Sequence, residues 1–165
     1  MDPGYINIIK TNNTGAYLMP NFISDIGSEE KLLENILKDK VGGYRSSELH
    51  LGTTWDSQLS YLLSTALVNY ETERIGGYTF AAEEFQNGIK NVVPTGHTFK
   101  AFPVMFSHFD TDKMMLHIHG NKVGHEVLGV RGDQVRLAIR VKIVPYPENM
   151  CAVWVMIAAR FRSSH

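Results

Sequence analysis

The chain has 165 residues, 44% hydrophobic and 20% charged, a composition typical of one globular domain around a single core. Its net charge of −1 gives no overall field that would attract nucleic acid or an anionic membrane. Its single cysteine excludes an internal disulfide, and no apolar run approaches the roughly 18 residues of a transmembrane helix. Asp2 stands where a signal peptide would carry positive charge, so we expect a soluble, intracellular protein.

Residues 1–27 differ from the rest of the chain. They are rich in Asn, Thr, Gly and Pro, and scattered apolar residues interrupt this turn-forming background. The pattern predicts an extended arm docked either on its own domain or on a partner, and the sequence leaves both open. The apolar residues that we expect to make these contacts include Tyr5, Ile8, Tyr17 and Phe22.

Two segments after the arm have the apolar spacing of helices. Ser28 is a candidate N-cap for the first, which the glycine pair at 42–43 should end. A second helix should begin near Thr54 and carry apolar residues on one side as far as Tyr70. The glycine pair at 76–77 should end that helix.

Pro94 marks the change from helical to strand periodicity. A third helix, about 81–93, must finish before it, because proline disfavours helical geometry in the preceding residue. The segment 96–109 then alternates as a strand does, although Pro103 confines that strand to an edge or a bulge.

The strongest strand signal is a hairpin near the C-terminus. Residues 133–144 alternate apolar and largely basic side chains, "PYPEN" forms a turn, and a second alternating strand follows. If Val144 pairs with Met150, Arg140 lies beside Trp154 on the outer face. The fold class is therefore α+β, with N-terminal helices packed on an antiparallel β-sheet that ends in a long C-terminal hairpin.

These segments define two parts of the chain. We expect an extended arm at 1–27 and a single α+β domain at 28–165.

The outer face of the hairpin is a candidate binding surface. A solvated sheet face is the simpler explanation, and docking onto an acidic protein surface is the alternative. Nucleic acid is disfavoured, because acidic residues offset the charge elsewhere and no aromatic stacking platform is evident. The basic residues are Arg136, Arg140, Lys142, Arg160 and Arg162, with Trp154 and Met156 as apolar anchors.

"LHIHGNKVGHE" raises the possibility of a metal site. His117 and His119 would share one face of a strand, and His125 or His108 could complete a zinc site if the chain folded back. Histidines on a solvated loop or strand explain the segment equally well, and the H-E-x-x-H pattern is absent. We therefore expect no metal and no cofactor, and His117, His119 and His125 remain the candidate ligands for the metal alternative.

Cys151 is the only candidate thiol nucleophile. It lies at the start of a strand rather than at a helix N-terminus, where a thiol pKa would be lowered. The chain also lacks a G-x-S-x-G elbow, a P-loop and a G-x-G-x-x-G turn. We expect a protein that is not an enzyme; the alternative is a small metal-dependent or cysteine hydrolase that uses the histidines or Cys151.

Three blocks of sequence carry a family resemblance. They are "GTTWDSQLSYLLSTALVNYETER", "EEFQNGIKNVVPTGHTFKAFPVMF" and "RGDQVRLAIRVKIVPYPENMCAVWVMIAARFRSS". In this order they resemble the C-terminal region of the 76-kDa centrosomal protein family, over roughly residues 28–165. A shorter block, "VPTGHTFKAFPV", is similar to part of the coiled-coil and C2-domain protein of the ciliary transition zone.

The resemblance implies a structural, protein-binding role at a centriole, basal body or ciliary axoneme. In that family a C2-like domain and a transglutaminase- or papain-like domain precede this module, so Cys151 inherits no catalytic role. The partners implied are proteins of a centriolar or ciliary assembly, including tubulin or microtubule-associated proteins. We expect a free-standing C-terminal module, built into the assembly through its arm and its basic face.

Overall fold

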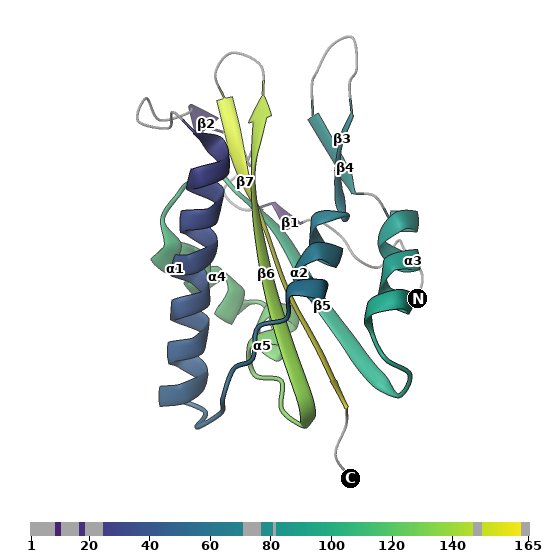
Figure 1. Cartoon of the computed structure of the whole chain (residues 1–165). Helices are drawn as coiled ribbons and strands as arrows, with labels where there is room; N and C mark the ends of the chain where they lie inside the picture. The colour runs from purple at the N-terminus through teal and green to yellow at the C-terminus, as the bar shows by residue number, and fades with distance from the viewer. Residues whose placement is uncertain are drawn as a thin grey trace.

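A central β-sheet organises the protein. The computed structural model describes residues 9–10, 17–18, 25–70, 77–80, 82–146 and 150–162. Its three long strands are β5 (His97–Phe106), β6 (Asp133–Tyr146) and β7 (Met150–Arg162), and β7 runs antiparallel between the other two (Figure 1). The predicted α+β class, with an antiparallel sheet and a long C-terminal hairpin, is confirmed.

Two short strands extend the sheet with residues of the predicted arm. Strand β1 (Ile9–Lys10) pairs in parallel with β5, and β2 (Tyr17–Leu18) pairs antiparallel with β7, where Tyr17 lies opposite Cys151. Parts of the arm thus dock on its own domain. Tyr5, Ile8 and Phe22, which we expected to make contacts, lie outside the described residues.

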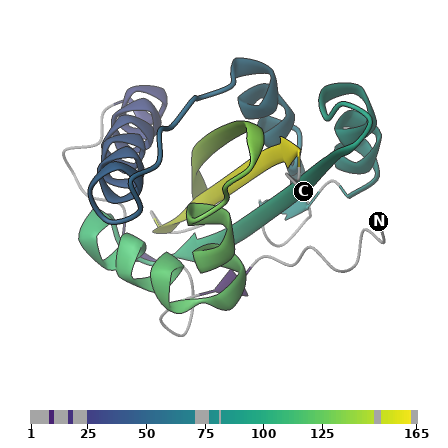
Figure 2. The same ribbon diagram turned by 90° about the horizontal axis from the view of Figure 1, so that it is seen from below.

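Helices cover both faces of the sheet (Figure 2). One face carries α1 (Ile26–Ser47), α4 (Thr111–Gly120) and α5 (Lys122–Leu128), which share a core with Leu137 and Val155. The other carries α2 (Ser57–Ser64) and α3 (Ala82–Val92), which pack with Trp154, Met156 and small residues such as Ala138 and Ala158. A separate hairpin joins β3 (Leu67–Tyr70) to β4 (Gly77–Phe80).

The expectation that the outer face of the hairpin is open to solvent is therefore wrong. Trp154 is 1% exposed and Met156 is fully buried, so neither is a surface anchor. Every residue from Cys151 to Ala159 is buried, a continuous apolar run typical of a strand covered on both faces. Half of the apolar residues of β7 face α2 and α3. The alternation of residues along a strand does not show whether a second layer of helices covers its outer face.

The predicted hairpin register is also wrong, by two residues. Val144 pairs with Ala152 rather than with Met150, and Arg140 lies opposite Met156 rather than Trp154. The reason is the turn, because Pro145 and Tyr146 continue β6 instead of leaving it.

Several predicted helix boundaries shift. Asp25, not Ser28, caps α1 by accepting from the Ser28 N–H, and the helix continues through the glycine pair at 42–43. The buried Val41 and Arg45 hold this last part against the core, which offsets the low helix propensity of glycine. Helix α3 lies where the third helix was predicted.

The second predicted helix is shorter than expected. Asp56 rather than Thr54 caps α2, and the helix ends at Ser64. Leu67 and Tyr70 belong to β3. Their spacing happens to continue the helical pattern of α2, which made the predicted helix too long.

Two helices were missed altogether. Asp110 caps α4 by accepting from the Asp112 and Lys113 N–H groups. Asn121 caps α5 in the same way. The segment with the histidines is therefore helical, neither the strand nor the solvated loop considered from its sequence.

Helix α1 closes the free edge of β6 with two glutamates. The Val141 N–H donates to Oε1 of Glu34 at 2.9 Å, and the Ile143 N–H donates to Oε2 of Glu30 at 2.7 Å. Four helical residues rise about 6 Å and two strand residues span about 6.7 Å, so side chains four apart on α1 match alternate N–H groups of β6. Farther along the edge, the Leu137 N–H donates to the Thr54 carbonyl at 2.9 Å. These contacts occupy an edge that could otherwise pair with another chain.

Arg45 ties three separate segments together from inside the protein. This side chain is 1% exposed, and its guanidinium donates to the carbonyls of Gly52, Leu128 and Val130 and to the hydroxyl of Thr53. Burial, and then the nearby charge of Arg131, lower the pKa of Arg45 from its ordinary value. Arg45 thereby links the end of α1 to the loop before α2 and to the end of α5.

Replacing Glu30 and Glu34 together by leucine should destabilise the fold and expose the β6 edge. Two strand N–H groups lose their acceptors, each at a cost of about 1–3 kcal/mol. Urea unfolding should show a lower free energy of unfolding. Size-exclusion chromatography should show new oligomers that pair through the exposed edge. The Glu30→Gln/Glu34→Gln control keeps an acceptor oxygen at both sites, and equal stability of the two variants would contradict the edge-capping role.

Arg45→Met should lower the free energy of unfolding by at least about 3 kcal/mol, because several buried acceptors lose their donor at about 1–3 kcal/mol each. Thermal and urea unfolding measure the change. Arg131→Met, at an exposed position nearby, is the control and should change stability little. Similar losses in both variants would refute a special role for Arg45.

Candidate functional site

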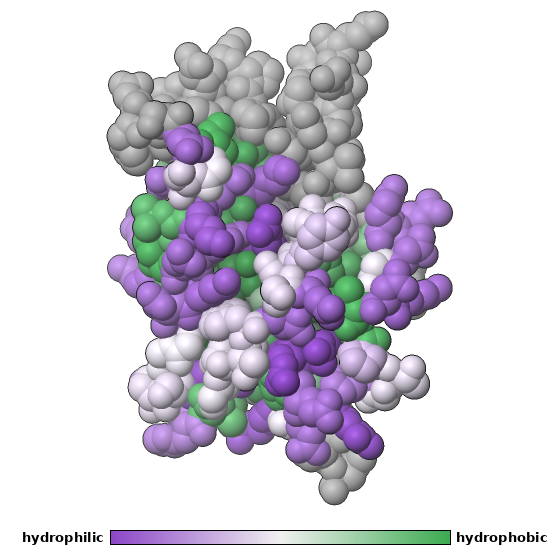
Figure 3. All heavy atoms as spheres, viewed as in Figure 1, coloured by the Kyte–Doolittle hydropathy of each residue, from purple (hydrophilic) through white to green (hydrophobic). Residues whose placement is uncertain are grey.

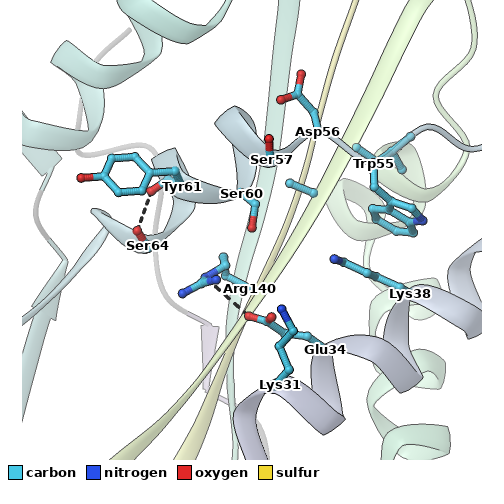
Figure 4. Close-up of a pocket in the computed structure, with 12 residues that line it drawn as sticks. Lys31, Glu34, Lys38, Trp55, Asp56, Ser57, Ser60, Tyr61, Ser64 and Arg140 are labelled. Atoms are coloured by element: carbon cyan, nitrogen blue, oxygen red, sulfur yellow. Dashed lines mark hydrogen bonds and ion pairs between the residues drawn. The ribbon is translucent and has the colours of Figure 1, made fainter. Parts of the chain in front are cut away.

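A groove lies between α1 and α2 along β6 (Figure 4). Its cavity has a volume of about 420 Å³. The side of the groove formed by α1 carries Lys31, Glu34 and Lys38, and β6 provides Leu137, Ala138 and Arg140. The opposite side, formed by α2 and the residues before it, comprises Trp55, Asp56, Ser57, Ser60, Tyr61 and Ser64.

The two acidic residues of the groove are engaged within the protein. Glu34 is 5% exposed; it accepts the Val141 N–H and lies 3.4 Å from Nε of Arg140. Asp56 accepts from two backbone N–H groups of α2 and from Arg160, 2.9 Å away. Burial opposes ionisation of Asp56, but the hydrogen bonds from the Leu59 N–H and Arg160 outweigh it and lower its pKa.

Cations and hydroxyl groups border the opening. Lys38 lies over the ring of Trp55, with 5.6 Å from its Nζ to the ring centroid. Tyr61 is 73% exposed on the outer side of α2, which also carries the serines, and the Ser64 hydroxyl donates to the Tyr61 carbonyl at 2.6 Å. Figure 3 shows mostly hydrophilic side chains over this face.

A small cavity of about 50 Å³ shares two lining residues with the groove. Ser64 and Arg140 line both spaces, and Trp154 lines the small one. The indole N–H of Trp154 is buried and has no hydrogen-bond partner, which is uncommon for a buried donor. Glu30 and Lys142 also border this cavity.

The predicted basic residues are split among different environments. Arg140 lines the groove and Arg160 turns inward to Asp56, with side chains 39% and 14% exposed. Arg136 and Lys142 are partly buried on β6, and Arg162 is exposed at the end of β7. These residues do not form the continuous, solvent-exposed basic surface that the alternating sequence of the two strands predicted.

The predicted histidines lie on or near α4 and α5 and are partly buried, except for exposed His125. His117 packs against Phe102 and Phe106, with ring centroids 6.3 and 5.6 Å away, and its Nε2 is buried without a hydrogen-bond partner. His119 packs edge-on against Tyr44 at 4.3 Å. Among the described residues, no three potential ligands from His, Cys, Asp and Glu come together as a metal would require.

Burial lowers the pKa of His108, His117 and His119 from the ordinary value. For His108 the neighbouring carboxylate of Asp110 partly opposes this effect. These imidazoles therefore resist protonation, as expected of neutral side chains packed against a core.

Cys151 is fully buried, in β7 opposite Pro145 of β6 and Tyr17 of β2. Burial of this kind keeps a thiol away from substrate. The hydrolase alternative, based on the histidines or Cys151, thus gains no support from the geometry of the described residues.

The binding residues predicted from the sequence did not include Lys31, Lys38, Tyr61 or the serines of α2. A signal was present, because Tyr61 lies off the apolar side formed by Leu59, Leu62 and Leu63. An aromatic residue on the polar side of a short helix is a candidate contact.

Acidification should destabilise the protein through its partly buried histidines, His108, His117 and His119. As pH falls below about 6.5, the unfolded chain takes up protons before the folded one, because folding lowers these pKa values. Urea unfolding from about pH 7 to about pH 5 should show a falling free energy of unfolding, with a smaller fall in His117→Leu.

His50→Asn is the matched control for the histidine experiment. His50 is exposed, and asparagine accepts its left-handed backbone, with φ of 56°. The same flattening of the pH profile in both variants would refute the assignment to His117.

No helix in the described ranges combines the length and apolar character needed to cross a bilayer. Comparison with solved structures gives no match.

The family model of the "Centrosomal protein of 76 kDa C-terminal domain" matches residues 22–162.

The chain is also similar to curated proteins named "Centrosomal protein of 76 kDa". It is 45% identical to the Xenopus tropicalis protein over 139 residues, which is 84% of this chain and 21% of that protein. With the Danio rerio and Homo sapiens proteins it shares 47% identity over 116 residues, 70% of this chain and 18% of each of them. The chain thus spans about a fifth of the length of these relatives, and with its match over residues 22–162 it belongs to the family of the C-terminal domain of the 76-kDa centrosomal protein.

Proposed function

We propose that the chain is a non-catalytic, protein-binding structural module of the centrosome and its centrioles, including the basal body and axoneme of cilia. Family membership over residues 22–162 is the observation that carries this proposal, because the curated relatives are named as centrosomal proteins. On this proposal the protein acts in the cytoskeleton of the cytoplasm.

The internal architecture supports a binding role over a catalytic one. The fold buries Cys151 and packs His117 against aromatic side chains, and it leaves a charged groove open between α1 and α2. A module of this kind presents side chains on a rigid scaffold to other proteins.

Two surfaces are proposed to make the contacts with the assembly. The first is the part of the predicted basic face that stays accessible, Arg136, Arg140, Lys142 and Arg162, which suits an acidic surface such as tubulin or a microtubule-associated protein. The second is the N-terminal arm, for which Tyr5, Ile8, Tyr17 and Phe22 remain the proposed contacts. The proposed boundaries are 1–27 for the arm and 28–165 for the domain.

The module, tagged in ciliated cells, should stay with isolated centrioles, basal bodies and axonemes through detergent and high-salt extraction. Immunoblots of the pellet and supernatant measure the retained fraction, and a soluble enzyme of the cytosol marks complete release. Full release of the wild-type chain would refute the structural role.

Charge reversal at Arg136 and Arg162 should release the module from that pellet without unfolding it, because neither side chain forms an ion pair within the described residues. The control is Lys113→Glu/Lys122→Glu, two exposed lysines on α4 and α5 with the same change in net charge. Circular dichroism checks the fold of both variants. Equal retention of the two would rule out the basic face.

A further inference from the structure

The groove presents positive charge to its opening. Its acidic residues, Glu34 and Asp56, are turned toward β6 and Arg160, with side chains 6% and 11% exposed. Lys31 is exposed, and neither Lys31 nor Lys38 has an acidic partner within the described residues. The charge available to a ligand is therefore cationic, although the whole chain has a net charge of −1.

The small cavity, which shares Ser64 and Arg140 with the groove, is lined by a hydrogen-bond donor that has no acceptor. Trp154 is 1% exposed, and its indole N–H has no partner in the described part of the chain. A buried donor without an acceptor destabilises the protein, and an incoming oxygen acceptor would remove this penalty. The cavity, about 50 Å³, has room for such a group.

Glu30 also borders this cavity, but its carboxylate already accepts the Ile143 N–H at 2.7 Å. The positive charges of Lys142 and Arg140 act on it from β6. Among the described residues, no acceptor is bonded to the indole N–H of Trp154.

We propose that this groove binds an acidic peptide segment of a partner protein, with carboxylates near Lys31 and Lys38 and one oxygen acceptor at the indole N–H of Trp154. The inference rests on the proposed function and names its class of partner. Lys31 and Lys38 lie about 10 Å apart along the helix axis, a span that about three extended residues cover. The exposed ring of Tyr61 provides apolar contact at the rim.

Fluorescence anisotropy with a fluorescein-labelled Glu-Gly-Ser repeat peptide tests the charge requirement. The wild-type chain should bind this peptide and not the matching Gln-Gly-Ser peptide. Lys31→Glu/Lys38→Glu should weaken binding at least about tenfold, because both proposed ion pairs become repulsive. Lys113→Glu/Lys122→Glu has the same net charge and should bind like the wild type.

The Trp154 contact has its own readout. The chain contains two tryptophans, Trp55 and Trp154, so a ¹⁵N-edited NMR spectrum shows two indole N–H signals, and Trp55→Phe assigns them. Saturation with the glutamate peptide should move the Trp154 proton signal downfield, as a new hydrogen bond requires. An unchanged Trp154 signal at saturation would overturn this part of the proposal.

Three results would overturn the groove as an acidic-peptide site: absence of binding, equal loss of binding in the two charge-reversed variants, or equally tight binding of single-stranded DNA of matched charge. None of these depends on centrosomal retention. If the wild-type chain is retained but does not bind the peptide, only this inference fails. If it binds the peptide but is released from the centrosome, only the proposed cellular setting fails.

Discussion

Strand β7 is apolar on both faces, and the rest of the fold follows from the need to keep it from water. Every residue from Cys151 to Ala159 is buried. The long partners β5 and β6 protect its two edges, and one layer of helices covers each face. Because β7 occupies the centre, β6 becomes an outer strand whose own free edge must then be closed. Helix α1 closes that edge with Glu30 and Glu34, which explains why these two carboxylates are held against β6.

The groove is a consequence of this arrangement. Helices α1 and α2 lie on opposite faces of the sheet and meet only along the edge of β6, so the space between them stays open (Figure 1). The carboxylates nearest to this space are used within the fold, by Val141 and Arg140 for Glu34 and by Arg160 for Asp56. The lysines are left facing outward. The groove is therefore positive on a chain of nearly neutral charge, because its carboxylates are paired within the fold and its lysines are not.

Some parts of this structure could be predicted because the relevant signal is local. The apolar spacing of 81–93 and the stop at Pro94 predicted α3, and the alternation of 133–144 predicted β6. Other parts could not. Whether Trp154 faces solvent depends on whether a helix covers it, and strand alternation is the same in both cases. The glycine pair at 42–43 ends an isolated helix but not one whose next turn carries the buried Arg45. Helices α4 and α5 have ordinary N-cap residues, Asp110 and Asn121, but the two-residue spacing of His117 and His119 also fits one face of a strand.

The sequence by itself determined the α+β class, the antiparallel hairpin and the family, because these depend on periodicity and on residue order along the chain. The tertiary structure alone decided which side chains are accessible on the surface. Arg140 and Arg160 look equivalent in the sequence, yet one lines an open groove and the other is nearly buried beside Asp56. Lys31 and Lys38 look like ordinary charges of a solvated helix, and only the position of α2 places them in a groove with Trp55 and Tyr61. The exposure of a charged side chain and its ion-pair partners depend on segments that are distant in the chain. A local sequence pattern therefore cannot predict them.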